Sequence, residues 1–235
     1  MITAVVFDLD GVIVDSEQVW DEVREDYVRE TGGTYTDESA RDMMGMSSPE
    51  WSRYMAEALR VPGTPEEINA AIVERMLARY GEAPPLIPGA VEAVRRIGAQ
   101  MPLAIASSSN RELIDVVLRA SGLAADFGVT VSSEEVPRGK PSPDVYLEAA
   151  RRLGVRAERC GAVEDSHNGI RSAKAAGMRV IAVPNPHFPP GDEALAVADV
   201  VLRSISELGV DVVDGLAALP AWIEARERER WSGER

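Results

Sequence analysis

The sequence contains very little cysteine and very little lysine. Cys160 is the single cysteine among 235 residues, so the chain cannot form an internal disulfide, which is typical of a protein in a reducing compartment. Lysine occurs only at Lys140 and Lys174, whereas the chain has 23 arginines. A compact ammonium and a planar guanidinium make different contacts. A lysine retained in such an arginine-rich chain is therefore a candidate for a role that arginine cannot fill.

Long apolar runs and an excess of positive charge are also missing. No stretch approaches the roughly 18 apolar residues of a membrane-spanning helix. The beginning, MITAVVFDLDG, has no basic segment before its apolar run, so we expect no secretion signal. The formal net charge of −14 argues against nucleic acid and anionic membranes as partners. We expect a cytoplasmic protein, present as a monomer or a small homo-oligomer, that binds neither nucleic acid nor membrane.

The sequence does contain short apolar runs that each lead into polar residues. AVVF leads into Asp8, PLAIA into Ser107, and CGAV into Glu164 and Asp165. Segments with helical apolar periodicity separate these runs, and a further run, MRVIAVP, follows the last of them. Strands that alternate with amphipathic helices predict an α/β fold with a doubly wound parallel sheet and helices on both faces. Ligands of such sheets bind outside the carboxyl ends of the strands, where these polar residues are expected.

The segment of residues 16–84 interrupts this alternation, because it has helical patterns and no convincing strand. Its stretch TPEEINAAIVERMLARYG begins with a threonine cap, a proline in the first turn and acids near the amino end. We therefore expect a catalytic core domain of residues 1–15 and 85–235, with an all-helical domain of residues 16–84 inserted into it. The charged end EARERERWSGER is expected to be a fraying surface helix.

Asp8 and Asp10 stand where the first apolar run ends. A carboxylate at a half-buried position is costly unless something pairs with it. In an extended chain, residues two apart point the same way, so the two acids would either share a divalent cation or divide the roles of nucleophile and proton carrier. Taken alone, the pattern is equally compatible with a simple turn, because aspartate and glycine are common turn residues.

The other polar strand ends are also ambiguous when each is taken alone. Ser107 precedes a helix, so it either only caps that helix or also holds an anion there. Lys140 lies in the loop PRGKPSPD, and a loop lysine is usually solvated. Glu164 and Asp165 are compatible with a plain helix cap. The combination of two acids, a hydroxyl, a lysine and a second acidic pair, in this order, is more specific than any one of them.

Four segments carry a resemblance to a known family. FDLDGVIVDSE, IASSSN, GKPSPDVY and VEDSHNGIRSAKAAGM resemble, in order and spacing, the four motifs of the haloacid dehalogenase-like superfamily of phosphoryl-transfer enzymes. The resemblance covers the whole core, and the inserted helices resemble the small cap of many members. It implies a Mg²⁺-dependent phosphatase of small phosphomonoesters that acts through an aspartyl phosphate. The first cap helix is similar to that of sugar- and polyol-phosphate phosphatases, a group that includes 2-deoxyglucose-6-phosphate phosphatase.

The resemblance also implies roles for the acidic residues. Asp8 would be the nucleophile that attacks phosphorus. Asp10 would protonate the leaving alkoxide and later take a proton from the attacking water. The Mg²⁺ ion would be held by Asp8, by the backbone carbonyl of Asp10 and by Asp165, with Glu164 in contact or one water away. This set of oxygen ligands suits Mg²⁺.

The remaining implied roles concern the phosphoryl group and the rest of the substrate, a small phosphorylated metabolite. Ser107 and Lys140 would hold the phosphoryl oxygens, whose charge has to be neutralised for the attack. Candidates for contacts with the rest of the substrate are Glu17, Ser47, Ser108 and Asn110.

Two alternatives to the phosphatase remain. A β-phosphoglucomutase-like sugar phosphomutase shares the core, but it carries an arginine in the loop that corresponds to Gly45–Glu50, where this chain has Ser48, and a histidine where this chain has Trp20. We therefore expect hydrolysis. A catalytically silent binding module is disfavoured because every catalytic position is present. Structural roles are expected for His167, His187 and Cys160, and Trp20 is expected in the interface between the inserted helices and the core.

Overall fold

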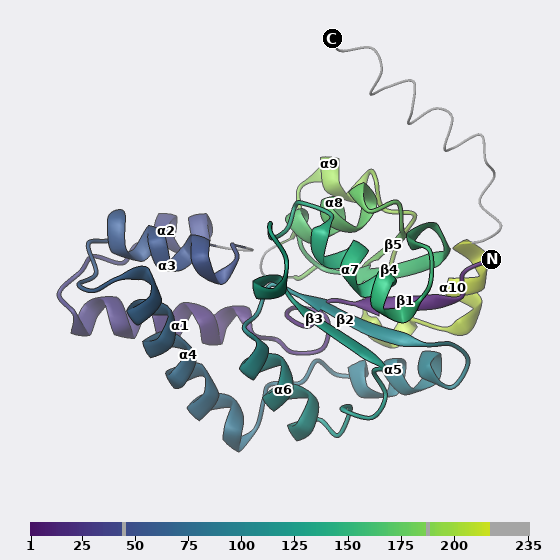
Figure 1. Cartoon of the computed structure of the whole chain (residues 1–235), viewed down its shortest axis with the longest axis horizontal. Coiled ribbons are helices and arrows are strands. Elements are labelled where there is room, and N and C mark those ends of the chain that lie inside the picture. Colours follow the sequence, from purple (N-terminus) through teal and green to yellow (C-terminus); the bar gives the residue numbers. More distant parts are fainter. Residues whose placement is uncertain (44–45, 187–188, 217–235) are drawn as a thin grey trace, which may run out of the picture.

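The computed structural model describes residues 1–43, 46–186 and 189–216. It confirms the predicted α/β fold, with a six-stranded sheet in the order β3-β2-β1-β4-β5-β6 in which every neighbouring pair is parallel (Figure 1). The strands are β1 (Ala4–Phe7), β2 (Leu103–Ser107), β3 (Val129–Ser132), β4 (Cys160–Glu164), β5 (Arg179–Ala182) and β6 (Val200–Val201).

The three central strands are those that the apolar runs predict. All residues of β1, β2 and β4 are buried, and Phe7 pairs with Ile105 on one side and with Val163 on the other. This register brings the carboxyl ends of the three strands to the same edge of the sheet. The strands that the sequence does not reveal, β3 and β6, are the two sheet edges. β3 (VTVS) alternates apolar and polar residues and is only partly buried, and β6 has only two residues, so their apolar pattern is weak.

Helices cover both faces of the sheet, because successive residues of each strand point to opposite sides. Val5 and Phe7 face an apolar layer that includes α5 and α6, whereas Ala4 and Val6 face a second layer that includes α7 and α8 (Figure 1). The helices of the core are α5 (Ala90–Gly98), α6 (Arg111–Ala120), α7 (Asp144–Leu153), α8 (His167–Ala175), α9 (Asp192–Leu195) and α10 (Val210–Gly215).

Four helices lie between β1 and α5 in the sequence and form a group to one side of the sheet (Figure 1). They are α1 (Glu17–Glu30), α2 (Asp37–Met43), α3 (Ser48–Glu57) and α4 (Pro65–Glu82). We call them the inserted helices. Their buried apolar side chains include Trp51, Met55 and Ile72. As predicted, Thr64 caps the start of α4, and its hydroxyl accepts a hydrogen bond from the N–H of Glu67.

The segment EARERERWSGER lies outside the described residues. Within the described ranges, no helix is both long enough and apolar enough to cross a membrane.

Candidate active site

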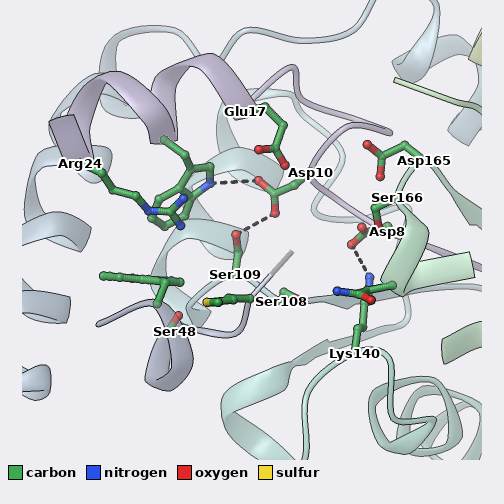
Figure 2. Close-up of a pocket in the computed structure, with 14 residues that line it drawn as sticks. Asp8, Asp10, Glu17, Arg24, Ser48, Ser108, Ser109, Lys140, Asp165 and Ser166 are labelled. Atoms are coloured by element: carbon green, nitrogen blue, oxygen red, sulfur yellow. Dashed lines mark hydrogen bonds and ion pairs between the residues drawn. The ribbon is translucent and has the colours of Figure 1, made fainter. Parts of the chain in front are cut away.

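A pocket opens where the carboxyl ends of the central strands face the inserted helices (Figure 2). Of the residues singled out in the sequence as candidate site residues, it is lined by Asp8, Asp10, Glu17, Ser108, Lys140 and Asp165. Asp8 directly follows β1, and Asp165 directly follows β4. The parallel register therefore brings together carboxylates that lie far apart in the sequence.

Lys140 is a buried cation beside the acids of this site. Its Nζ lies 2.9 Å from Oδ1 of Asp8 and 2.6 Å from Oε1 of Glu164, and its side chain is only 3% exposed. The ring of Tyr146 lies 5.2 Å from the same nitrogen. Burial alone would lower the pKa of Lys140, but the charges of Asp8 and Glu164 outweigh it and raise that pKa above its ordinary value. The ammonium therefore stays charged.

Glu164 is fully buried, and each of its two carboxylate oxygens accepts hydrogen bonds from neighbouring groups. Oε1 accepts hydrogen bonds from Lys140 at 2.6 Å and from the Tyr146 hydroxyl at 2.7 Å. Oε2 accepts from the N–H of Asp165 at 3.1 Å, and from the N–H and hydroxyl of Ser166 at 3.3 and 3.1 Å. These contacts position Glu164 as the group that orients Lys140.

The carboxylates of Asp8, Glu164 and Asp165 fit a divalent cation. Each offers an oxygen, and the three oxygens lie within 4.8 Å of one another. Burial raises the pKa of both Asp8 and Asp165, and the nearby charge of Glu164 raises them further; Lys140 acts in the opposite direction. Three buried acids thus face one ammonium, and this negative excess needs a cation. Hard oxygen donors of this kind suit Mg²⁺.

Asp10 is held by donors from both sides of the pocket. Its Oδ1 accepts from the Ser16 hydroxyl at 2.6 Å and from Nε1 of Trp20 at 3.4 Å. Its Oδ2 accepts from the hydroxyl of Ser109 at 2.7 Å (Figure 2). It also accepts from the hydroxyl of Ser107 at 3.3 Å. Ser16 and Trp20 lie at the start of α1, whereas Ser107 and Ser109 lie at the end of β2 and just after it. The orientation of Asp10 therefore depends on both the inserted helices and the core.

Ser107 itself is fully buried and does not line the pocket. Besides donating to Asp10, its hydroxyl accepts a hydrogen bond from the N–H of Ser109 at 2.9 Å. Its neighbour Ser108 does line the pocket. The phosphate contact expected for Ser107 stays a prediction, and the structure adds a contact that orients Asp10.

Two of the candidate substrate residues have other partners in the structure. Ser47 precedes α3, and both its N–H and its hydroxyl donate to Glu50, at 2.8 and 2.6 Å. Asn110 accepts a hydrogen bond from Ser48 at 2.7 Å and donates to Glu134 at 2.7 Å, so it joins the inserted helices to the core. Neither Ser47 nor Asn110 lines the pocket, and their substrate contacts stay predictions.

The inserted helices contribute pocket residues that the sequence analysis missed or placed elsewhere. Arg24 lines the pocket between Trp20 and Trp51. Trp20 and Arg24 are four residues apart on α1, so they share a helix face. That spacing was visible in the sequence, but nothing in it showed which way the face points. The expected position of Trp20 between the two parts is confirmed, and this side chain also lines the pocket.

The remaining candidates lie away from the pocket. Nε2 of His167 lies 3.3 Å from Oε1 of Glu193, and His167 is not part of the lining. Cys160 is buried in β4, and burial raises the pKa of its thiol to about 11, so the thiol is not activated as a nucleophile. His187 lies outside the described residues.

Comparisons with known proteins identify similar sequences and structures. A sequence model of the family described as haloacid dehalogenase-like hydrolases matches residues 2–177. Hexitol phosphatase B of Escherichia coli K12 is 36% identical over 88% of this chain and 94% of that protein. A phosphorylated carbohydrates phosphatase of Thermotoga maritima is 33% identical over 76% of this chain and 83% of that protein. A crystal structure of a CbbY variant from Rhodobacter sphaeroides in complex with xylulose-1,5-bisphosphate has a TM-score of 0.77 and 30% identity, covering 89% of this chain and 97% of that one.

Gly11 allows the turn after Asp10 to pass close to Asp165. Its φ is +72°, and an added Cβ would lie 1.8 Å from Oδ2 of Asp165. We predict that Gly11→Ala displaces this carboxylate and abolishes the rise in melting temperature that Mg²⁺ produces in the wild type. The matched control is Gly154→Ala, since Gly154 has a φ of +71° and no atom within 4 Å of an added Cβ.

Both substitutions carry a similar backbone strain of roughly 1 kcal/mol. A difference between the two variants in their response to Mg²⁺ therefore reports the displaced carboxylate. Thermal unfolding with Mg²⁺ and with a chelator measures it. A Gly11→Ala variant that is stabilised by Mg²⁺ as strongly as Gly154→Ala would contradict the assigned cation site.

Glu17 gives the site a pH dependence. Burial raises the pKa of Glu17 from 4.5 to about 7. The folded protein therefore binds more protons than the unfolded chain between these values, and the free energy of unfolding falls as the pH rises through this window. We predict that the free energy of unfolding of Glu17→Gln falls less than that of the wild type as the pH rises through this window. In the presence of a chelator, the variant should match the wild type near about pH 4 and exceed it at about pH 8 by at most roughly 3 kcal/mol.

Urea unfolding of both proteins across this range measures the difference. The raised pKa values of Asp8 and Asp165 also make the free energy of unfolding fall as the pH rises. Because the charge of Glu17 contributes to the raised pKa of Asp165, the difference between the two pH profiles reports Glu17 together with its effect on Asp165. Parallel profiles would show that Glu17 is not desolvated.

Proposed function

The chain belongs to the haloacid dehalogenase-like hydrolase family and is a phosphoric monoester hydrolase, and on this premise we propose that it is a Mg²⁺-dependent phosphatase of small sugar or polyol phosphates. The reaction proceeds through an aspartyl phosphate on Asp8. The observation that carries the proposal is the state of Asp8 itself. Its Oδ1 accepts from Lys140 and from the N–H of Leu9 at 2.8 Å, whereas Oδ2 has no hydrogen bond within the described residues. One oxygen is held in place and the other is available for attack.

Charge neutralisation is the main task of such a site, because an anionic carboxylate attacks an anionic phosphate. Lys140 supplies one positive charge next to Asp8, and Glu164 keeps it there. Asp8, Asp165 and Glu164, with the backbone carbonyl of Asp10, are the groups that would hold Mg²⁺. When bound, the ion would supply further positive charge to the phosphoryl oxygens.

Asp10 is the proposed proton carrier. It protonates the leaving alkoxide while Asp8 attacks, and it then accepts a proton from the water that hydrolyses the aspartyl phosphate. The four donors around its carboxylate support this role, because they hold it at the pocket in a defined orientation. Ser107 and Lys140 are the proposed contacts of the phosphoryl oxygens, with Ser108 lining the same pocket.

The inserted helices are the proposed cap, comprising residues 16–84, over a core of residues 1–15 and 85–235. They cover the carboxyl edge of the sheet and supply Glu17, Trp20 and Trp51 to the pocket. The hydrogen bond between Ser48 and Asn110 fastens this cap to the core. A closed cap keeps water out until the leaving group has departed.

The relatives support the substrate class. The names of two of them refer to hexitol and carbohydrate phosphates, and a structural relative was crystallised with a sugar bisphosphate. Hydrolysis is favoured over phosphate transfer within the sugar because residues 46–50, around the start of α3, contain no arginine, and this is the position where the resemblance places the arginine of a sugar phosphomutase. Arg41 and Arg53 are exposed and do not line the pocket.

We predict that Asp8→Asn lowers phosphate release by a factor of about 10⁴ or more while the fold is retained, because an amide is a poor nucleophile of the same shape. Release of phosphate from p-nitrophenyl phosphate and from hexitol and hexose 6-phosphates, with and without Mg²⁺, measures this. The matched control is Asp15→Asn, an exposed aspartate in the same motif that should keep its activity.

Products are identified by phosphorus NMR. The proposal expects inorganic phosphate in step with substrate loss and no isomeric sugar phosphate. Multiple turnovers by a pure Asp8→Asn protein would exclude Asp8 as the nucleophile. Conversion of glucose 1-phosphate, primed with its bisphosphate, to glucose 6-phosphate faster than phosphate appears would show a mutase instead.

A further inference from the structure

Arg24 lines the pocket on the side away from the catalytic acids, and the mechanism gives it no task. Figure 2 shows it opposite Asp165 and Lys140, with Ser108 and Ser109 between them. The residue is only 7% exposed. Its guanidinium makes no hydrogen bond and no ion pair to any described residue, and its buried Nε is without a partner.

Aromatic rings hold this guanidinium in place. Its central carbon lies 4.8 Å from the ring of Trp20 and 5.1 Å from that of Trp51, whose centroids are 5.9 Å apart. The Trp20 ring is itself anchored by the bond from Nε1 to Asp10. Cation–π contacts of this kind use the faces of the rings and leave the N–H groups of the guanidinium unpaired.

No acid in the described part of the chain supplies the missing partner. Glu17 and Asp10 line the same pocket, but neither forms an ion pair with Arg24. Burial lowers the pKa of Arg24, although the charge of Glu17 partly opposes this. A buried cation without a hydrogen-bonded partner is costly. The cost is removed most completely by an oxyanion, to which guanidinium donates two parallel hydrogen bonds.

We propose that Arg24, between Trp20 and Trp51, is a specificity-determining residue that binds an oxyanion at the end of the substrate opposite the scissile phosphate. This proposal rests on the phosphatase function above. The favoured substrates are phosphomonoesters whose far end carries a carboxylate or a second phosphate. Neutral hexitol phosphates leave the guanidinium unpaired and are poorer substrates.

Matched pairs of esters test the proposal, with the ratio of their kcat/KM values as the readout. Gluconate 6-phosphate and sorbitol 6-phosphate differ only in a carboxylate or a hydroxymethyl group at the far end. Xylulose 1,5-bisphosphate and xylulose 5-phosphate test a second phosphate in the same way. We expect the wild type to prefer the anionic member of at least one pair by about 10- to 100-fold, mainly through KM. The pair with the larger ratio identifies the oxyanion.

Substitutions of Arg24 should remove the preference. Arg24→Gln keeps a polar side chain without the charge, and its ratio is expected to fall to about one. Arg24→Lys keeps the charge but not the paired donors, so its ratio should fall between those of the wild type and Arg24→Gln. Arg53→Met is the control, because Arg53 is an exposed arginine of the same inserted helices that lies outside the pocket, and it should keep the wild-type ratio.

The outcomes separate the two proposals. Equal hydrolysis of both members of each pair by the wild type, or a ratio that survives in Arg24→Gln, overturns the Arg24 assignment and leaves the phosphatase intact. If Arg24→Gln does not fold, Arg24→Lys decides, and an unchanged ratio in that variant overturns the assignment. Failure of the wild type to hydrolyse any ester with Mg²⁺, p-nitrophenyl phosphate included, overturns both.

Discussion

The buried ammonium of Lys140 lies 2.9 Å from Asp8 and 2.6 Å from Glu164, and the rest of the site depends on these two contacts. They join the end of β1, the loop before α7 and the end of β4. Without them, three buried carboxylates would face one another with no compensating charge inside the protein. Removing one partner of a buried ion pair typically costs roughly 3–5 kcal/mol because the remaining charge stays buried. Arginine, common elsewhere in the chain, is a planar fork that does not fit between two acids at these distances.

The second feature that organises the site is the shared position of Asp10. Ser107 and Ser109 approach it from the core, and Ser16 and Trp20 approach it from the inserted segment. The group proposed to move the proton is therefore oriented only when both parts are in place. Trp20 also stacks on Arg24. One side chain therefore contacts both Arg24, which would select the substrate, and Asp10, which would move the proton. With the proposed roles of Asp10 and Arg24, Trp20 would couple specificity to catalysis.

Much of this arrangement could be predicted from the sequence because strand ends in a parallel sheet meet at one edge. AVVF, PLAIA and CGAV correspond to β1, β2 and β4, and the acids that follow the first and last of these runs lie together with Lys140. The scarcity of lysine pointed to Lys140, but Lys174, the other lysine, pairs with Asp199 at 3.2 Å, away from the pocket. Scarcity alone was therefore an incomplete guide.

The parts that could not be predicted depend on packing between distant segments. The edge strand β3 alternates apolar and polar residues, and the edge strand β6 has only two residues, so neither gives a clear apolar run. The hydrogen bond between Ser48 and Asn110 joins residues 62 positions apart, and no local sequence pattern predicts it. The position of Arg24 between Trp20 and Trp51 depends on how α1 and α3 pack together, and the sequence analysis did not single out this residue.

The central claim is that Asp8 becomes phosphorylated during turnover, and direct trapping of that species tests it most directly. The wild-type protein is mixed with Mg²⁺ and a hydrolysable phosphomonoester, quenched in acid within the first turnover, and digested for peptide mass mapping. The account predicts phosphate on the peptide that contains Asp8, at a level that rises and then falls as the substrate is consumed. Turnover without any phosphorylated peptide, or phosphate carried on another residue, would contradict it.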